Sequence, residues 1–268
     1  MTISIDLIKK LRDATLAPLG DCKEALTEAE GDIAIAQDIL KKKWAIKADK
    51  KADRDTNAGV VKFVVIDGSL IGIKLLCETD FVSKNESFWS LVDQIIDIIA
   101  SESSDIDLDS VSDSLMDRMT TVLKDNAVMI GENMRIAYII KKAGNVSIYN
   151  HMGNSIASAI FYAGDDYLCK NMAKDCALQV AAMNPLYVSL DQVDSALIEK
   201  LTKEFTEEVI SSGKSPDIAA KIVEWKVQKS LQDDVLCEQS SIKDPSKKIK
   251  ELCPQWFVIN SMFRISVW

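Results

Sequence analysis

The sequence predicts an α+β fold in which helical segments flank antiparallel β-sheets. Apolar residues recur at helical spacing over about the first 45 residues and again over residues 193–234. Residues 60–77 instead form two β-rich runs around Asp67-Gly68, a dipeptide typical of β-hairpins. With 268 residues, 47% of them hydrophobic, the chain is long enough for one large domain or two to three small ones.

The N-terminal segment, residues 1–46, is expected to form three short helices. The first has an apolar face made of Ile5, Ile8 and Leu11. Asp21 followed by Glu24 resembles a capping box, which would begin the second helix. Gly31 can end that helix, and Asp32 can cap the third. So small a bundle buries little surface and is only marginally stable by itself.

A charged linker is expected over residues 47–56, which contain no large apolar side chain. After this linker the pattern of apolar residues changes to the period of two that is typical of β-strands. Val60–Ile66 and Leu70–Cys77 are predicted to form a hairpin, because both central positions of a two-residue turn need a positive φ and Asp67-Gly68 supplies it.

The segment Thr79-Asp80-Phe81-Val82 follows the second of these strands and precedes a helix expected to begin near residues 83–85. Asp80 and Phe81 place an acid beside an aromatic ring where a strand becomes a loop, so the pair could project from a rigid base. The alternative is that Phe81 packs on Phe88 or Leu91 and merely fixes the start of that helix. The residues alone favour this second interpretation.

A second unit of similar order is expected further along. Its predicted elements are strands at Arg135–Lys141, Val146–Tyr149 and Ser155–Ala163, a helix over about Asp166–Met183, and a final strand within Phe257–Trp268. Strand, turn, strand and helix thus occur twice. We therefore expect two related α+β subdomains, at residues 57–140 and 141–268.

A helical hairpin is expected as an insertion at about residues 190–235. Its two amphipathic arms are about Val193–Ser211 and Pro216–Asp234. Between the arms, Gly213 can end the first helix and Ser215 can cap the second.

Composition excludes several classes of function. The net charge of -9 argues against broad contact with nucleic acid, which requires many Lys and Arg side chains to neutralise phosphates. No apolar stretch approaches the roughly 20 residues needed to cross a membrane, and no secretory signal is visible, so a cytoplasmic protein is expected. The six cysteines lack the close pairs typical of zinc sites. Neither a metal nor a cofactor is expected.

No catalytic site is expected either. His151 is the only histidine, and no nucleophile or orienting acid is identifiable beside it. Gly213-Lys214-Ser215 superficially suggests a phosphate-binding loop, but Glu208 occupies the position where that motif requires glycine.

Several motifs in order along the chain resemble translation elongation factor Ts. The most specific is Cys77-Glu78-Thr79-Asp80-Phe81-Val82 with Ser83-Lys84-Asn85 and Phe88 after it. The others are Leu11-Arg12 with Thr15, Asp21-Cys22-Lys23-Glu24-Ala25-Leu26 with Gly31-Asp32, Ile130-Gly131-Glu132-Asn133, Tyr149-Asn150-His151, Ser212-Gly213-Lys214-Ser215-Pro216 and Asp244-Pro245-Ser246-Lys247. The resemblance covers nearly the whole chain.

This resemblance implies a fold and a function. The fold is an N-terminal module of the ubiquitin-associated type, a core of two α+β subdomains, and a coiled-coil hairpin inserted in the second. The function is guanine-nucleotide exchange, in which the factor promotes GDP release from elongation factor Tu. The implied partner-binding residues are Arg12 and Leu19 in the helical module, Thr79, Asp80, Phe81 and Val82 at the nucleotide site, and His151 in the second subdomain.

Two departures from the family pattern are visible. The family has a Gly- and Met-rich run before Asp21, where this chain has Thr15-Leu16-Ala17-Pro18-Leu19-Gly20. Relatives commonly add a C-terminal helical module beyond the position of Trp268. The resemblance therefore implies a shortened factor whose contacts with the partner are distributed differently.

Overall fold

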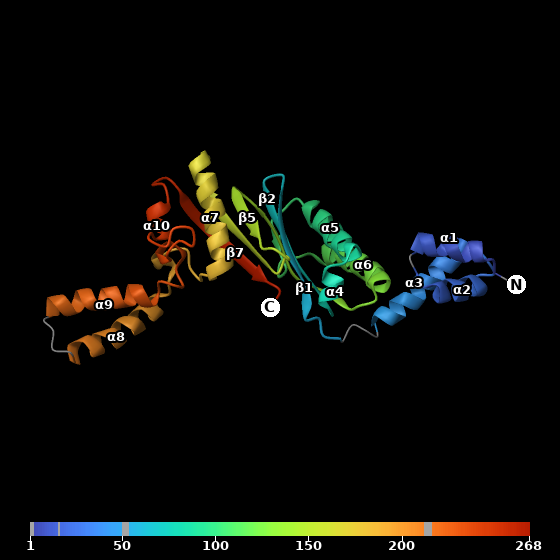
Figure 1. Cartoon of the computed structure of the whole chain (residues 1–268), viewed down its shortest axis with the longest axis horizontal. Helices are drawn as coiled ribbons and strands as arrows, with labels where there is room; N and C mark the ends of the chain where they lie inside the picture. The colour runs from blue at the N-terminus through green and yellow to red at the C-terminus, as the bar shows by residue number, and fades with distance from the viewer. Residues whose placement is uncertain (1–2, 16, 50–53, 212–215) are drawn as a thin grey trace.

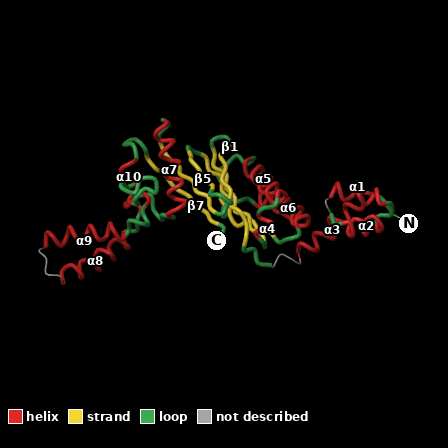
Figure 2. Tube along the Cα trace, in the orientation of Figure 1, coloured by secondary structure: helices red, strands yellow, loops and turns green. Residues whose placement is uncertain are grey.

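The computed structural model describes residues 3–15, 17–49, 54–211 and 216–268. The molecule is elongated: helices α1 to α3 lie at one end, the hairpin of α8 and α9 lies at the other, and two β-sheets lie between them (Figure 1). Figure 2 shows the strands gathered in the middle with helices outside them on both sides. The predicted α+β class with antiparallel sheets is confirmed.

The N-terminal elements are α1 (Ile5–Thr15), α2 (Leu19–Glu28) and α3 (Ile33–Asp49). They pack around fully buried leucines contributed by each helix, namely Leu11, Leu26 and Leu40. The capping box predicted at Asp21 is wrong, because α2 already begins at Leu19, after an N-cap at Pro18 that makes no side-chain bond. Asp32 does cap α3, accepting hydrogen bonds from the N–H groups of Ala34 and Ile35. Helix α3 reaches Asp49, three residues into the predicted linker.

The first sheet has the order β1-β2-β4-β3 and is antiparallel throughout. Its strands are β1 (Ala58–Ile66), β2 (Ser69–Cys77), β3 (Ile106–Asp107) and β4 (Met134–Ala143). The predicted hairpin is confirmed, with φ values of 49° at Asp67 and 73° at Gly68. The short strand β3 lies within the Asp- and Ser-rich residues 101–110.

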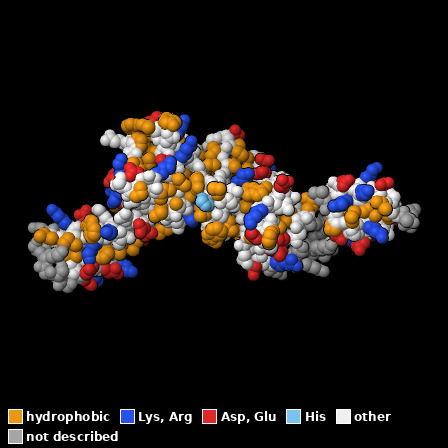
Figure 3. All heavy atoms as spheres, in the orientation of Figure 1, with side chains coloured by type: hydrophobic (Ala, Val, Ile, Leu, Met, Phe, Trp, Pro, Cys, Tyr) orange, Lys and Arg blue, Asp and Glu red, His pale blue; other side chains and the backbone are white. Residues whose placement is uncertain are grey.

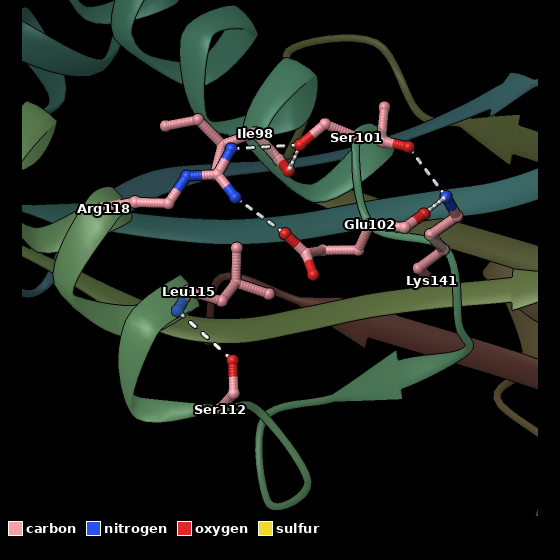
Figure 4. Close-up of polar contacts among 8 residues, drawn as sticks. Ile98, Ser101, Glu102, Ser112, Leu115, Arg118 and Lys141 are labelled. Carbon is pink, nitrogen blue, oxygen red and sulfur yellow. Dashed lines mark hydrogen bonds and ion pairs between the residues drawn. The ribbon is translucent and has the colours of Figure 1, made fainter.

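Helices α4 (Asp80–Ser83), α5 (Glu86–Ala100) and α6 (Asp113–Ile130) belong to the same half of the core. The side chains of α5 and α6 form the main apolar cluster with the outer face of the first sheet. Figure 4 shows how the C-terminal end of α5 is held: the ammonium of Lys141 donates to the carbonyl oxygens of Ala100 and Glu102. The guanidinium of Arg118 donates to the Glu102 carboxylate at 2.7 Å and to the Ser101 hydroxyl at 3.0 Å.

The second sheet has the order β5-β6-β7 and is covered by one long helix. Its elements are β5 (Val146–Asn150), β6 (Ile156–Ala163), β7 (Val258–Ser266) and α7 (Tyr167–Met183). The strands on either side of Gly144-Asn145 do not form a hairpin, contrary to the expected second strand-turn-strand unit. Strand β4 pairs with β2 and β3, and β5 pairs with β6, because each continues the apolar face of a different sheet.

The two sheets pack face to face through a second apolar cluster. Phe63 from the first sheet, Phe161 and Phe263 from the second, and their aliphatic neighbours fill this space. The layers of the core are therefore α5 and α6, the first sheet, the second sheet, and α7 (Figure 1). The tail forms a strand as predicted, and Phe263, Ile265 and Val267 face the cluster between the sheets.

Between α7 and β7 the chain forms the helical hairpin and a short irregular segment. The elements here are η1 (Leu190–Gln192), α8 (Ser195–Ser211), α9 (Pro216–Ser230), η2 (Leu236–Glu238) and α10 (Ile249–Leu252). A bridge between Tyr187 and Val235 joins the two ends of the insertion. The predicted stop at Gly213 and cap at Ser215 lie outside the described residues. In the described part of the chain, no helix is both long and apolar enough to cross a membrane.

Candidate functional site

The segment Thr79–Val82 follows β2 after one intervening residue, Glu78, and forms a tip on which Asp80 and Phe81 are exposed. Thr79 is the N-cap of α4, and its hydroxyl accepts a hydrogen bond from the N–H of Val82 at 3.4 Å. Phe81 is 81% exposed, so its ring does not pack on Phe88 or Leu91. This exposure rules out the interpretation in which Phe81 fixes the start of the following helix. That start is instead provided by Asn85, whose side chain accepts from Ser87 N–H.

The base of the tip is held by polar contacts with the residues that precede β4. The Glu132 carboxylate accepts from the hydroxyl of Thr79 at 2.6 Å and from its N–H at 3.0 Å. Glu78 in turn accepts from the N–H of Asn133 at 2.7 Å. Sequence reasoning placed Glu132 and Asn133 in a family motif but gave them no role. Their role depends on a pairing between distant segments that local pattern does not report.

Electrostatics at the tip reflect these contacts. Burial, reinforced by the negative charge of Glu132, raises the pKa of the Cys77 thiol to about 12. The neutral thiol donates to the carbonyl of Thr79 at 3.2 Å. A hydrogen bond from the Lys84 ammonium, at 2.8 Å, lowers the pKa of the Asp80 carboxyl. Asp80 is therefore a carboxylate at neutral pH, paired one helical turn away with an exposed lysine.

His151 lies in the turn between β5 and β6, on the second sheet. Its Nδ1 is 3.1 Å from the hydroxyl of Tyr149. In Figure 3 the single histidine, in pale blue, lies at the surface near the middle of the molecule. Beside it Met152 is 89% exposed, a feature that sequence reasoning missed because an isolated methionine in a turn has no distinctive pattern.

The side chain of Asn150 attaches this turn to the first sheet. Its amide accepts from the N–H of Phe63 and donates to the carbonyl of the same residue, both at 2.9 Å. The carbonyl of Asn154 accepts from Val61 N–H at 2.7 Å. Strand β1 is an edge of its sheet, so these bonds satisfy backbone groups that would otherwise lack partners.

Arg12 and Leu19 lie apart from both of these features. Arg12 is exposed in the last turn of α1, and Leu19, at the first position of α2, is 51% exposed. Figure 1 shows these helices at the end of the molecule opposite the helical hairpin. The structure therefore brings Thr79, Asp80, Phe81 and Val82 together, but it leaves His151 and the two N-terminal residues at separate places.

Little in the described residues suggests reaction chemistry. Across these residues, no group of three or more His, Cys, Asp or Glu side chains is arranged to hold a metal ion. The ring contact that the structure gives His151 is with Tyr149, a phenol that is also its hydrogen-bonding neighbour. The arrangement consists of exposed apolar side chains on well-anchored backbone, which is suited to binding another protein.

Comparison with known proteins gives one consistent result. The sequence profile of the family described as Elongation factor TS matches residues 78–266, which include the tip and the His151 turn. Elongation factor Ts of Hydrogenobaculum sp. is 36% identical over 258 residues, covering 94% of this chain and 93% of the relative. Elongation factor Ts of Aquifex aeolicus is 34% identical over 268 residues (94% and 92% covered), and that of Burkholderia multivorans is 35% identical over 254 residues (93% and 85%). The chain therefore belongs to the elongation factor Ts family, a family of translation factors that act in protein biosynthesis.

Proposed function

We propose that this protein is a guanine-nucleotide exchange factor that promotes GDP release from elongation factor Tu. The observation that carries this proposal is the 81% exposure of Phe81, on a short helix within the segment matched by the family profile. An aromatic ring left in water on an anchored backbone is available for burial in a partner. The factor itself performs no chemical reaction in this mechanism and uses no cofactor.

The mechanism is a coupling between two binding events. If the factor weakens the binding of GDP to the partner, then GDP must weaken the binding of the factor by the same ratio. Burying one Phe side chain contributes roughly 1.5–3 kcal/mol. Since each tenfold corresponds to about 1.4 kcal/mol, Phe81 accounts for roughly a tenfold to hundredfold effect. A larger acceleration requires disturbance of the partner's magnesium site and a wider interface.

Asp80 supplies negative charge near the phosphates in this proposal. Like charges repel more strongly where an interface excludes water. In the free protein the Asp80 carboxylate is paired with Lys84, and both side chains are exposed. Exposed ion pairs of this kind are weak, so the pair can open when the tip enters the partner.

Two further parts of the chain, the N-terminal module and the His151 turn, supply the wider interface. We propose that residues 1–46 form a ubiquitin-associated-like module that binds the partner through Arg12 and Leu19, and that residues 47–56 link it to the core. Residues 57–140 carry the tip, and residues 141–268 carry His151 and the coiled-coil hairpin inserted at about 190–235. The cytoplasm, where translation takes place, is the proposed location.

The test is release of labelled GDP from elongation factor Tu in the presence of substoichiometric amounts of this protein. Phe81→Ala is expected to slow release by roughly tenfold to hundredfold, matching the free energy of burying one Phe side chain. Asp80→Ala is expected to slow it as well. Trp225→Ala is the matched control, because Trp225 is an aromatic residue 57% exposed on the distant helix α9.

Each outcome has a clear meaning. Phe81→Ala and Asp80→Ala variants that are folded and as active as the wild type would show that the tip does not displace nucleotide. A stable complex with unchanged GDP release would identify the protein as a scaffold for the same partner. If the protein neither accelerates GDP release nor binds elongation factor Tu, the proposal is wrong.

A further inference from the structure

The pairing of β2 with β4 ends in an unusual way just below the exposed tip. The last ladder pair joins Cys77 to Met134. Beyond it, side-chain carboxylates replace the backbone carbonyls as acceptors. Glu132 accepts from Thr79 N–H at 3.0 Å, and Glu78 accepts from Asn133 N–H at 2.7 Å. We call Glu78 and Glu132 the crossed carboxylates, because each accepts from the residue that follows the other in the chain.

The tip above this point contacts the core through one side chain, Val82, which is partly buried against the apolar cluster of α5, α6 and the first sheet. Helix α4 has four residues, none of them buried. A helix this short does not form without support, because nucleation fixes several dihedral angles for very few hydrogen bonds. Its backbone bonds are of mixed length, at 3.4 Å from Ser83 to Thr79, 3.3 Å from Lys84 to Phe81 and 2.9 Å from Asn85 to Val82. The direction of Phe81 must therefore be set by the contact of Val82 with the core and by the residues at either end of the helix.

Glu132 acts at the N-terminal end of α4 through a relay in Thr79. A threonine hydroxyl has one proton, and here it is donated to the Glu132 carboxylate at 2.6 Å. The lone pairs of the same oxygen then face the N–H of Val82, at 3.4 Å. That capping bond is long for an N–H···O contact, so the two bonds to Glu132 hold Thr79 more firmly than the cap itself.

We propose that Glu132 is a positioning residue for the Asp80-Phe81 tip, acting through Thr79 and not by contact with the partner. This inference rests on the proposed exchange function and adds to it a residue outside the tip segment. Glu132 is half-buried, whereas Phe81 is exposed, so the two can be separated experimentally.

The experiment measures the rate of GDP release from elongation factor Tu against the concentration of this factor. Glu132→Ala removes both bonds to Thr79, and Thr79→Val removes only the hydroxyl. Glu132→Gln keeps one oxygen acceptor and loses the other. The matched control is Glu102→Ala, because Glu102 is also a partly buried carboxylate that joins two elements of the same half of the core (Figure 4).

We expect Glu132→Ala to lower the maximal release rate by about tenfold, the effect of losing charge-assisted hydrogen bonds at one site. The half-saturating concentration is expected to change by less than about twofold, because most of the interface is untouched. The maximal release rates of Thr79→Val and Glu132→Gln should lie between those of the wild type and Glu132→Ala. Glu102→Ala should match the wild type.

A double-mutant cycle separates positioning from general destabilisation. If Glu132 acts by directing Phe81, then Glu132→Ala should lower the rate by less than about twofold when Phe81→Ala is already present. The same loss with and without Phe81 would overturn the inference, because it would show a merely structural role. An unchanged maximal rate in folded Glu132→Ala would overturn it too.

A measurement without the partner keeps this inference distinct from the exchange function. Amide hydrogen exchange in the free protein should become faster at Thr79 and Val82 in Glu132→Ala, while the amides of α5 keep their wild-type protection. If wild type fails to accelerate GDP release, the proposed function is wrong, yet faster exchange at Val82 still supports positioning. Unchanged exchange at both amides would contradict positioning by Glu132.

Discussion

The tip at Thr79–Val82 and the turn at His151–Asn154 are both exposed, and both project near the edge strand β1, but they are anchored in opposite ways. The tip carries Phe81, 81% exposed, and the turn carries Met152, 89% exposed. Glu132 holds the tip at one end through Thr79. The turn is held at both ends, by the Asn150 side chain on Phe63 and by the Asn154 carbonyl on Val61.

This difference indicates different tasks for the two features. A segment anchored at both ends presents its side chains in one fixed orientation, which suits docking. The four-residue helix of the tip is held by Glu132 at Thr79 and by the packing of Val82 on the core, which leaves the Phe81 ring in solvent to enter a partner. The turn meets β1 at Val61, three residues from Ala58, which pairs with Cys77 at the base of the tip. At about 3.4 Å per residue, Val61 and Ala58 lie roughly 10 Å apart along this strand.

The largest effect on stability is expected at the anchor of the turn. Asn150→Ala leaves both the N–H and the carbonyl of the buried Phe63 without their partner. Leaving buried backbone groups unsatisfied costs about 1–3 kcal/mol, so we expect a loss of about 2 kcal/mol in the free energy of unfolding. Urea denaturation measures this loss.

The matched control for this change is Asn145→Ala. Asn145 is exposed, and its side chain donates at 3.2 Å to the Gly164 carbonyl and also interacts with the Tyr162 hydroxyl. Removing it should change stability by less than about 0.5 kcal/mol, as is usual for surface positions. Equal losses at the two asparagines would show that the turn is not specially anchored to β1.

A smaller and different effect is expected from the exposed side chains of the turn. His151→Ala together with Met152→Ala removes surface that the folded protein does not bury, so stability should change by less than about 0.5 kcal/mol. Titration calorimetry with elongation factor Tu should show affinity weakened by about tenfold, the value of one buried apolar side chain. The maximal rate of GDP release should be unchanged. A lower maximal rate with unchanged affinity would contradict the docking role of the turn.

The smallest effect is expected at the Asp80–Lys84 pair. The pKa of Asp80 is lowered from its ordinary value of 3.8 by the Lys84 ammonium. Because the pKa of Asp80 is lower in the folded protein than in the unfolded chain, any stabilisation by the pair is fully present above pH 3.8. This stabilisation is lost as the pH falls through the lowered pKa of the folded protein. Lys84→Ala should raise the pKa of Asp80 towards 3.8 in an NMR titration and leave stability at pH 7 unchanged.

Lys247→Ala is the control for that titration, because Lys247 pairs with a different carboxylate, Asp244, at 3.7 Å. It should leave the pKa of Asp80 as it is in wild type. An Asp80 pKa that stays low without Lys84 would point to another cause, such as the N–H groups at the start of α4.

Local sequence patterns were sufficient to predict most of the helices and strands. The β1–β2 hairpin follows from Asp67-Gly68, because a two-residue turn needs positive φ and few residues allow it. Asp32 caps α3 as its position predicts. The start of α2 was misplaced, since Asp21 has the chemistry of a cap although the chain already turns into helix after Pro18. Strand β3 was missed because two residues are too few to show a period.

The candidate site was predictable only in part. Family resemblance identified Asp80 and Phe81, but residue chemistry favoured a packed Phe81, and only the three-dimensional structure shows the ring 81% exposed. No sequence pattern indicated that Glu132 would bind Thr79 across 53 residues, or that Asn150 would bind Phe63 across 87.

Periodicity, turn chemistry and motifs are local properties of the chain, so they were enough to predict the α+β class, the hairpin turn, most helix positions and membership of the family. Which strands share a sheet became clear only in the folded molecule. The same holds for the backbone groups that lack a ladder partner at a strand end and for the side chains that bind them. Those choices depend on segments far apart in sequence meeting in space. They place Phe81 in the solvent above the crossed carboxylates.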